Sequence, residues 1–351
     1  MDAVYQKLAR HLDSLPGGFP ATDSGVELRI LKRLFTPQEA EIAAGMTMRL
    51  EPAAAVAQRL GRQAPDMEQT LYRMSKKGLI IRSDKGGRNH YMAAQFVVGI
   101  WEYHVNDLDE GLVRDFNEYV PYLMETQLDL KTQQLRVIPV SKSISAEMRV
   151  LPYEQAEKII QSQSKIVVAP CICRKEQKMI GKGCDKPEET CLIFAGAAHY
   201  YEGNQIGRVI DRDQALEILQ KAIEAGLVLQ PGNSQKPQNI CMCCGCCCQI
   251  LKNLKNVDKP ARYACTSYFA EVAEADCTAC GLCAESCQMG AIEVRETAEV
   301  DPERCIGCGL CVAACEVDAI RLSEKGADEK WVPPRNIVET YISIARERGK
   351  I

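Results

Sequence analysis

The chain has 351 residues, of which 46% are hydrophobic, and its formal net charge is -4 at pH 7. This composition excludes a disordered or fibrous protein, and the length suffices for two or three domains. Charged residues interrupt the N-terminal segment, and no stretch approaches the roughly 18 unbroken apolar residues of a membrane span, so we expect a soluble cytoplasmic protein without a secretory signal or a membrane span.

The N-terminal third, predicted as a domain over residues 1–100, has the pattern of short helices followed by a hairpin. Apolar periodicity with proline or glycine boundaries predicts four helices, at 26–35, 37–46, 52–61 and 65–78. Residues 79–94 predict two strands around the turn Lys85-Gly86-Gly87-Arg88. This order resembles a winged helix-turn-helix domain, in which 65–77 would be the second helix of the motif.

The charges of this region only weakly favour nucleic acid as a partner. A helix that reads DNA places basic or amide side chains near its N-terminal end, whereas here that end carries Asp66 and Glu68, with Gln69 and Arg73 as the available readers. Residues 23–88 hold 12 basic and 8 acidic side chains, which is a weak basic footprint. Protein docking or a structural role is therefore favoured, and DNA binding is the alternative.

The middle region, predicted as a domain over residues 101–265, mixes helical and strand patterns. Residues 96–108, 112–128 and 152–163 predict helices, and 135–140 and 165–170 predict strands. Asp211 and Gln214 form a capping-box pattern for a helix that Gly226 ends, before a strand-like segment. This alternation indicates a cysteine-rich α/β domain.

Cysteine usage points to metal. The chain has 19 cysteines and only 4 histidines, and a reducing compartment does not keep so many thiols as disulfides. Adjacent pairs such as Cys243 and Cys244 could not form a disulfide without severe strain. The shortage of histidine favours iron–sulfur chemistry over zinc.

The middle region offers two groups of cysteines. Cys171, Cys173, Cys184 and Cys191 follow a predicted strand, and the segment 240–249, ICMCCGCCCQ, has six cysteines in eight consecutive positions. A compact unit would bring the groups together, and with Cys265 it would offer eleven thiols. Because one cubane cluster needs four ligands, the unit could hold two centres, one centre with additional thiolates, or some free cysteines.

An additional iron–sulfur centre is favoured here over a zinc site and over metal-free redox thiols. Arg174 and the nearby lysines would favour anionic thiolates. Spacing alone leaves the ligand set open, and the predicted ligands are Cys171, Cys173, Cys184, Cys191, Cys243, Cys244 and Cys247.

The strongest signal of metal binding is the motif C-x2-C-x2-C-x3-C, which occurs twice near the C-terminus. Three thiolates at this spacing can surround one face of a cubane cluster, while the fourth points toward a partner cluster. Each motif is followed by a short apolar stretch, AIEV at 291–294 and AIRL at 319–322, and we expect these stretches to pair as strands beneath the clusters. The motif cysteines are Cys277, Cys280, Cys283 and Cys287, then Cys305, Cys308, Cys311 and Cys315.

Residues of about 271–325 resemble a bacterial-type two-cluster ferredoxin, and the corresponding domain is predicted over 266–325. The cross-ligation of that family implies one 4Fe-4S cluster on Cys277, Cys280, Cys283 and Cys315, and another on Cys305, Cys308, Cys311 and Cys287. The family usually has proline after each fourth cysteine, whereas this chain has Gln288 and Glu316.

The ferredoxin-like segment is acidic. Residues 271–325 contain 12 Asp and Glu against 4 Arg and Lys, and such a surface steers docking onto a basic patch of a redox partner such as a flavoprotein or another oxidoreductase. The last predicted part, 326–351, contains an amphipathic helix at 336–348.

The whole order of parts predicts an α+β protein and resembles a group of iron–sulfur proteins of anaerobes described as ferredoxin-domain 4Fe-4S binding proteins. The resemblance implies electron transfer through two 4Fe-4S clusters and an additional cysteine-ligated centre. Two alternatives are a redox- or iron-sensing winged-helix regulator, and a reductase of disulfides or cofactors at the middle centre. No nucleotide-binding motif and no defensible set of catalytic residues is present, so an oxidoreductase activity stays open.

Overall fold

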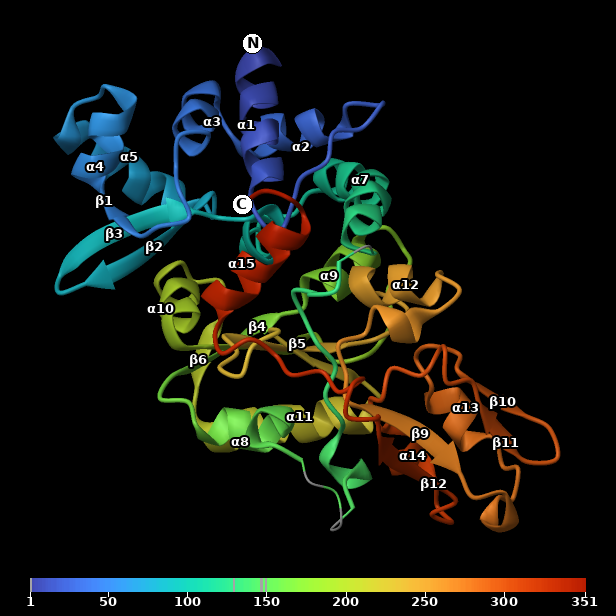
Figure 1. The fold of residues 1–351 in the computed structure, drawn as a ribbon. Helices are drawn as coiled ribbons and strands as arrows, with labels where there is room; N and C mark the ends of the chain where they lie inside the picture. The colour runs from blue at the N-terminus through green and yellow to red at the C-terminus, as the bar shows by residue number, and fades with distance from the viewer. Residues whose placement is uncertain (1, 129, 146–147, 149) are drawn as a thin grey trace. The chain divides into compact units, whose positions relative to one another are not determined.

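The computed structural model describes residues 2–128, 130–145, 148 and 150–351, and the chain divides into two units (Figure 1). The first unit comprises residues 1–129, 196–208 and 341–351, and the second comprises 130–195 and 209–340. Helices and antiparallel strand pairs occur together in both units, as expected for an α+β protein.

Helices dominate the first unit. Its core contains a cluster of aromatic rings in which Trp101 stacks on Phe116 with ring centroids 3.6 Å apart. The elements are α1 (Asp2–Ser14), α2 (Val26–Leu34), α3 (Pro37–Ala43), β1 (Glu51–Pro52), α4 (Ala53–Leu60), α5 (Ala64–Lys76), β2 (Ile80–Lys85), β3 (Arg88–Ala93), α6 (Trp101–Tyr103), α7 (Glu110–Leu128), most of α10 (Ala195–Gly203) and the end of α15 (Ile337–Glu347).

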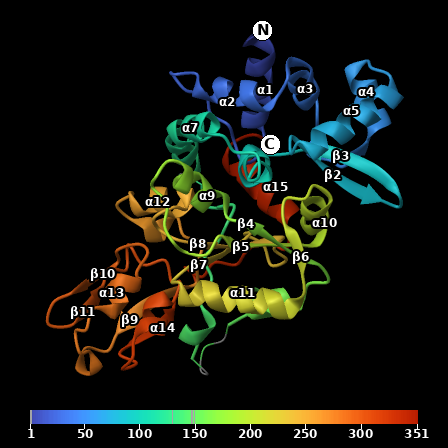
Figure 2. The same cartoon turned by 180° about the vertical axis from the view of Figure 1, so that it is seen from behind.

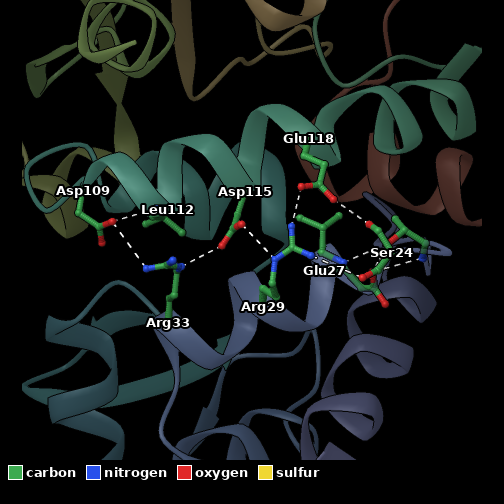
Figure 3. Close-up of polar contacts among 10 residues, drawn as sticks. Ser24, Glu27, Arg29, Arg33, Asp109, Leu112, Asp115 and Glu118 are labelled. Carbon is green, nitrogen blue, oxygen red and sulfur yellow. Dashed lines mark hydrogen bonds and ion pairs between the residues drawn. The ribbon is translucent and has the colours of Figure 1, made fainter.

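A network of ion pairs joins α2 to α7 (Figure 3). The carboxylate of Asp115 on α7 forms ion pairs with Nε of Arg29 at 3.1 Å and with Nε of Arg33 at 2.8 Å, and the Asp115 side chain is only 12% exposed. Glu118, one turn further along α7, pairs with Arg29 at 2.6 Å from a more exposed position. Because Asp115 is shielded from water and shared by two arginines, it is the stronger link of the network.

The predicted hairpin is confirmed. Strands β2 and β3 pair with Lys85 opposite Arg88, and Gly86 and Gly87 both adopt positive φ, as the two-residue turn requires. The short β1 adds to β3, giving the order β1-β3-β2 next to α4 and α5. Helix α5 also matches its prediction, and the assignment to the winged-helix class stays a prediction.

The helix predicted at 96–108 is largely wrong. The backbone at Val97, Val98 and Gly99 is not helical, and only a short helical stretch, which includes α6, follows before His104. Two β-branched residues and a glycine in succession disfavour a helix, while Phe96 is drawn into the aromatic core. The chain therefore turns there, and the next helix, α7, begins at Glu110.

The second unit is built on a five-stranded sheet with the order β6-β4-β5-β8-β7. Helices α8 and α11 pack on each other and lie along one side of this sheet, while α9 and α12 lie on the other side (Figures 1 and 2). The elements up to α12 are α8 (Ala156–Gln161), β4 (Ile166–Pro170), α9 (Ile172–Met179), β5 (Glu189–Phe194), β6 (Arg208–Ile210), α11 (Arg212–Glu224), β7 (Val228–Pro231), β8 (Asn239–Cys243) and α12 (Gln249–Lys255).

Several local predictions in this unit are confirmed. Strand β4 coincides with its apolar stretch, and Asp211 caps α11 through the expected capping box with Gln214. By contrast, residues 135–140 form only isolated bridges, through Leu135 and Ile138, instead of the predicted strand. Ile138 bridges to Leu229 of the edge strand β7, and Leu135 bridges to Gly232 just beyond that strand, but Pro139 lacks the N–H that a continued ladder needs.

The C-terminal part of the second unit contains two small sheets. Its elements are β9 (Tyr268–Val272), α13 (Leu282–Ser286), β10 (Ile292–Val294), β11 (Ala298–Val300), α14 (Leu310–Ala314) and β12 (Ile320–Glu324). The two apolar stretches after the cysteine motifs do form strands, β10 and β12, but they do not pair with each other. Strand β10 pairs with β11, which precedes the second motif, and β12 pairs with β9, which precedes the first motif.

Short 3-10 turns complete the second unit, at Ser141–Ser143, Pro152–Glu154, Pro260–Arg262 and Glu274–Asp276. None of the helices in the described part of the chain combines the length and the apolar character that crossing a bilayer requires.

Candidate metal centres

Glycines set the tight loops of the two cysteine motifs. Gly281 and Gly309 adopt positive φ directly before α13 and α14, a conformation that side-chain-bearing residues rarely adopt. At Gly307 a Cβ atom would lie 2.2 Å from the carbonyl oxygen of Tyr268. The loops can therefore curve closely around a bound group only with glycine at these positions.

The eight motif cysteines line two separate cavities. One cavity is lined by Cys277, Cys280, Cys283 and Cys315, and the other by Cys287, Cys305, Cys308 and Cys311. In each cavity, three cysteines come from one motif and the fourth comes from the other motif. The two groups coincide with the two ligand sets that the ferredoxin resemblance implies, and the role of each cysteine as a ligand stays a prediction.

Backbone N–H groups point at three of these sulfur atoms. Ala298 donates to Cys277 Sγ at 3.3 Å, Ala291 to Cys287 Sγ at 3.2 Å, and Ala270 to Cys305 Sγ at 3.4 Å. Such bonds stabilise negative charge on sulfur. The lining thiols and the donors around them fit a 4Fe-4S cluster in each cavity.

The cavities differ in burial. Cys280 is exposed, whereas burial raises the pKa of Cys308 to about 12. Burial also raises the pKa of Cys311 and Cys305. These inner thiols are neutral near pH 7 unless a metal replaces their protons. Cys280 is therefore the one exposed thiol among the eight that line the two cavities.

Gln288 joins the inner cavity to the middle cysteines. The inner cavity is the one lined by Cys287, Cys305, Cys308 and Cys311. The side-chain oxygen of Gln288 accepts a hydrogen bond from the N–H of Gly245 at 2.8 Å, and its amide nitrogen donates to the carbonyl of Gly226 at 3.0 Å. A Cβ atom on Gly245 would lie 2.5 Å from the carbonyl oxygen of Gln288. The residue after Cys287, where the ferredoxin pattern has proline, therefore contacts the segment between Cys244 and Cys246.

Four of the middle cysteines form a compact group. This four-thiol group consists of Cys184, Cys244, Cys246 and Cys247. Their sulfur atoms all lie within 4.8 Å of one another. The Sγ of Cys247 lies 3.6 Å from that of Cys184, and Cys184 and Cys244 are 3.9 Å apart. Four converging thiols match the number of ligands that a four-iron cluster or a zinc ion takes.

The structure separates the seven middle cysteines predicted as ligands. Cys184, Cys244 and Cys247 belong to the four-thiol group, whereas four others lie with Cys241 and Cys248 around β5 and β8. Sequence reasoning missed Cys246 as a member of the four-thiol group. Its position in CCGCC, directly after the glycine that turns the chain, was the available signal. The four cysteines outside this group are Cys171, Cys173, Cys191 and Cys243.

Arg174 lies beside this group and is fully buried. Its guanidinium donates to the carbonyl of Met242 at 3.2 Å, to the hydroxyl of Thr190 and to Cys244 Sγ at 3.6 Å. In the part of the chain that the structure describes, no carboxylate lies within ion-pair distance of it, and its Nε has no hydrogen-bond partner. A buried cation needs nearby negative charge, and the thiols of Cys171, Cys243 and Cys244 are the groups that face it.

The pKa values of the thiols reflect this cation. Burial alone would raise the pKa of Cys244, but the hydrogen bond from Arg174 brings it below the usual value. Burial and the neighbouring Cys244 raise the pKa of Cys246 to about 11. The pKa of Cys244 is thus shifted toward the thiolate form, while that of Cys246 is shifted toward the neutral thiol, whose proton a metal ion would displace.

The comparisons with known proteins identify one segment. Residues 276–319 match the family model described as a 4Fe-4S dicluster domain. None of the curated proteins and none of the solved structures matches the chain. The matched residues include all eight cysteines that line the two cavities. The C-terminal segment of this protein is therefore a ferredoxin-like 4Fe-4S domain.

Proposed function

We propose that the chain is an iron–sulfur electron-transfer protein or subunit, which carries single electrons between a partner oxidoreductase and a cysteine-ligated centre in its middle. The contact of Gln288 with Gly245 is the observation that carries this proposal. It connects a residue adjacent to the ferredoxin cysteine Cys287 with the backbone between two cysteines of the four-thiol group. A short covalent and hydrogen-bonded route therefore runs from one group of thiols to the other.

The chain supplies ligands for two 4Fe-4S clusters in its ferredoxin-like domain. Such a cluster, when bound, takes up and releases one electron at a time. The residues proposed to hold the outer cluster are Cys277, Cys280, Cys283 and Cys315. The residues proposed to hold the inner cluster are Cys287, Cys305, Cys308 and Cys311.

The exposure of the cysteines distinguishes the two ends of the proposed electron-transfer route. Cys280 is exposed and lies in an acidic segment, while Cys308 is half-buried and Cys311 is buried. A basic patch on a flavoprotein or another oxidoreductase complements that acidic surface. We therefore assign partner docking to the side of Cys280.

The four-thiol group is proposed to hold a third iron–sulfur centre. Arg174 supports this assignment, because a cluster with four thiolate ligands is anionic and would face the buried guanidinium. The cation would offset part of the cost of burying negative charge. Zinc on the same four thiols is the competing occupant.

The test is iron and acid-labile sulfide per chain on anaerobically purified full-length protein. We expect more than the roughly eight irons of two four-iron clusters. In the double variant Cys184→Ser/Cys246→Ser we expect a loss of about four irons, with the spin-resonance signals of the reduced ferredoxin clusters retained. Cys265→Ser is the control, because Cys265 lies in neither cavity and outside the four-thiol group.

Two outcomes would contradict the proposal. Zinc in place of iron on the four-thiol group would remove the third centre from the route. Clusters that no low-potential donor can reduce and no acceptor can reoxidise would remove electron transfer itself.

Helix α10 supports a second candidate function, a regulator in which the state of the middle cysteines changes DNA binding. This helix follows directly after β5, which carries Cys191. Within the first unit, Tyr200 of α10 donates to the carbonyls of Ser75 and Ile80 at 2.9 Å each. The chain thus runs from a cysteine-bearing strand to a helix that contacts the end of α5 and the start of the hairpin.

The junction between β5 and α10 is conformationally unusual, since Ala195 has φ 49°. A strained junction can respond to a change at the strand before it. Gel-shift titration with DNA from the protein's own genomic neighbourhood, at several salt concentrations and in oxidised and reduced states, tests this candidate. Binding that shows no dependence on salt or on cluster state would remove it.

A further inference from the structure

A second group of thiols lies apart from the four-thiol group and from the ferredoxin-like cavities. The thiols form a continuous series in which each thiol lies within hydrogen-bonding reach of the next one. At one end, Cys191 Sγ lies 4.0 Å from Cys241 Sγ. In the order of contact, this six-thiol group is Cys171, Cys173, Cys248, Cys243, Cys241 and Cys191.

The fold brings the group together from four segments. Cys171 caps α9 directly after β4, and Cys248 caps α12. Cys191 of β5 lies opposite Cys241 of β8 in the strand register. Because side chains two apart on a strand share a face, Cys241 and Cys243 both point toward the same group. The sequence predicts that the two groups of middle cysteines meet, but its local spacing does not predict how the thiols divide between two groups.

Polar groups around the six-thiol group donate toward sulfur. Asn239 Nδ2 lies 3.5 Å from Cys241 Sγ, and Gln230 Nε2 lies 4.0 Å from Cys248 Sγ. The backbone N–H groups of Ile250 and Leu251 also bond to Cys248. Donors directed at sulfur match thiolates, which accept hydrogen bonds, better than neutral thiols.

Arg174 provides an independent observation. Its guanidinium is fully buried, its Nε has no partner, and the groups that face its charge include Cys171 and Cys243 of the six-thiol group as well as Cys244. An anionic centre on the four-thiol group would contact the guanidinium of Arg174 through Cys244. Cys171 and Cys243 bring the six-thiol group close to the same buried cation.

We propose that the six-thiol group is a fourth metal site that binds a polynuclear iron–sulfur cluster, distinct from the centre proposed at the four-thiol group. One tetrahedral metal ion takes four thiolates, so six thiols in continuous contact serve at least two metal ions. Iron with sulfide is the class of cofactor that the ferredoxin-like domain of the same chain binds. The site goes beyond the proposed function, which needs only the four-thiol group.

The test replaces the cross-strand pair of the group in the full-length chain. Anaerobic native mass spectrometry of wild-type protein and of Cys191→Ser/Cys241→Ser would count iron, sulfide and zinc per chain. We expect the variant to lose at least two irons together with sulfide, while Cys265→Ser keeps the wild-type content. Spin resonance of the ferredoxin clusters shows that the variant has folded and that its other centres remain.

The outcomes separate this inference from the proposed function. Unchanged iron in the cross-strand variant, or zinc in the wild-type protein as the metal that the variant loses, would overturn the fourth site while leaving the electron-transfer proposal intact. If the variant does not fold, the variant Cys184→Ser/Cys246→Ser, in which the four-thiol group is disrupted, decides. More than about eight irons per chain in that variant supports the fourth site, because the two ferredoxin clusters account for only that number, and eight or fewer contradicts it.

Discussion

Gln288 holds Gly245 by a hydrogen bond of 2.8 Å from the glycine N–H to its side-chain oxygen. The two residues are neighbours of different groups of cysteines, since Gln288 follows Cys287 and Gly245 separates Cys244 from Cys246. The close approach also depends on glycine, because the carbonyl of Gln288 occupies the space a Cβ would need. This contact ties the residue after Cys287 directly to the turn between Cys244 and Cys246.

Replacing Gln288 by alanine tests this connection. Loss of the side-chain contacts with Gly245 and Gly226 should slow reduction of the middle centre while leaving the iron content unchanged. Rapid-freeze spin resonance after mixing with a low-potential donor measures the rate. Glu316→Ala is the matched control, because Glu316 occupies the same place after the second motif and is exposed. Equal slowing in both variants would contradict a specific route through Gln288.

Removing the charge of Arg174 should lower the reduction potential of the middle centres. A buried cation favours the more negative, reduced state, so Arg174→Gln is expected to shift the midpoint downward by on the order of 100 mV. A redox titration followed by spin resonance measures the shift. Lys178→Gln is the control on the same helix, because Lys178 is exposed and pairs with Glu188 at 2.6 Å. An unchanged potential in Arg174→Gln would mean that the cation is offset by other groups.

The two acidic residues of α7 should differ in their contribution to stability. Asp115→Ala removes a largely buried carboxylate shared by two arginines, and should lower the free energy of unfolding of the first unit by about 1–3 kcal/mol. Glu118→Ala removes a more exposed partner, and should cost about 0–1 kcal/mol. Urea unfolding in a Trp331→Phe background, followed by Trp101 fluorescence, measures both. Similar losses of stability in the two variants would show that the deeper burial of Asp115 does not make its contribution larger than that of Glu118.

His104 should make the first unit sensitive to acid. Burial lowers the pKa of its imidazole below the usual 6.5, and the neutral ring donates from Nδ1 to the carbonyl of Ile100 at 2.7 Å. A group with a lowered folded-state pKa contributes stability above its unfolded pKa and loses it as the pH falls. Wild-type protein should therefore lose more stability than His104→Gln between pH 7.5 and the lowered pKa of His104.

Thermal unfolding at several pH values measures this difference. His199→Gln is the control, since His199 is exposed, and it should follow the wild-type curve. Parallel curves for wild type and His104→Gln would show that other groups govern the acid response.

What the sequence determined by itself was the chemistry carried by local spacing. The C-x2-C-x2-C-x3-C repeat, the glycines of its loops, the capping box at Asp211 and the hairpin around Gly86 and Gly87 all depend on residues a few positions apart, so their patterns are readable directly. These patterns predicted the ferredoxin-like domain, helix α11 and the hairpin of β2 and β3.

Only the tertiary structure decided how the middle cysteines divide. Cys184 joins Cys244, Cys246 and Cys247 because the loop before β5 approaches the turn at Gly245. Cys191 and Cys241 are brought together by a strand register that no local pattern specifies. The contact of Gln288 with Gly245 is likewise a meeting of distant segments. Which thiols lie close enough to share a metal is therefore set by packing, because strand pairing and helix positions fix distances between residues that the chain separates.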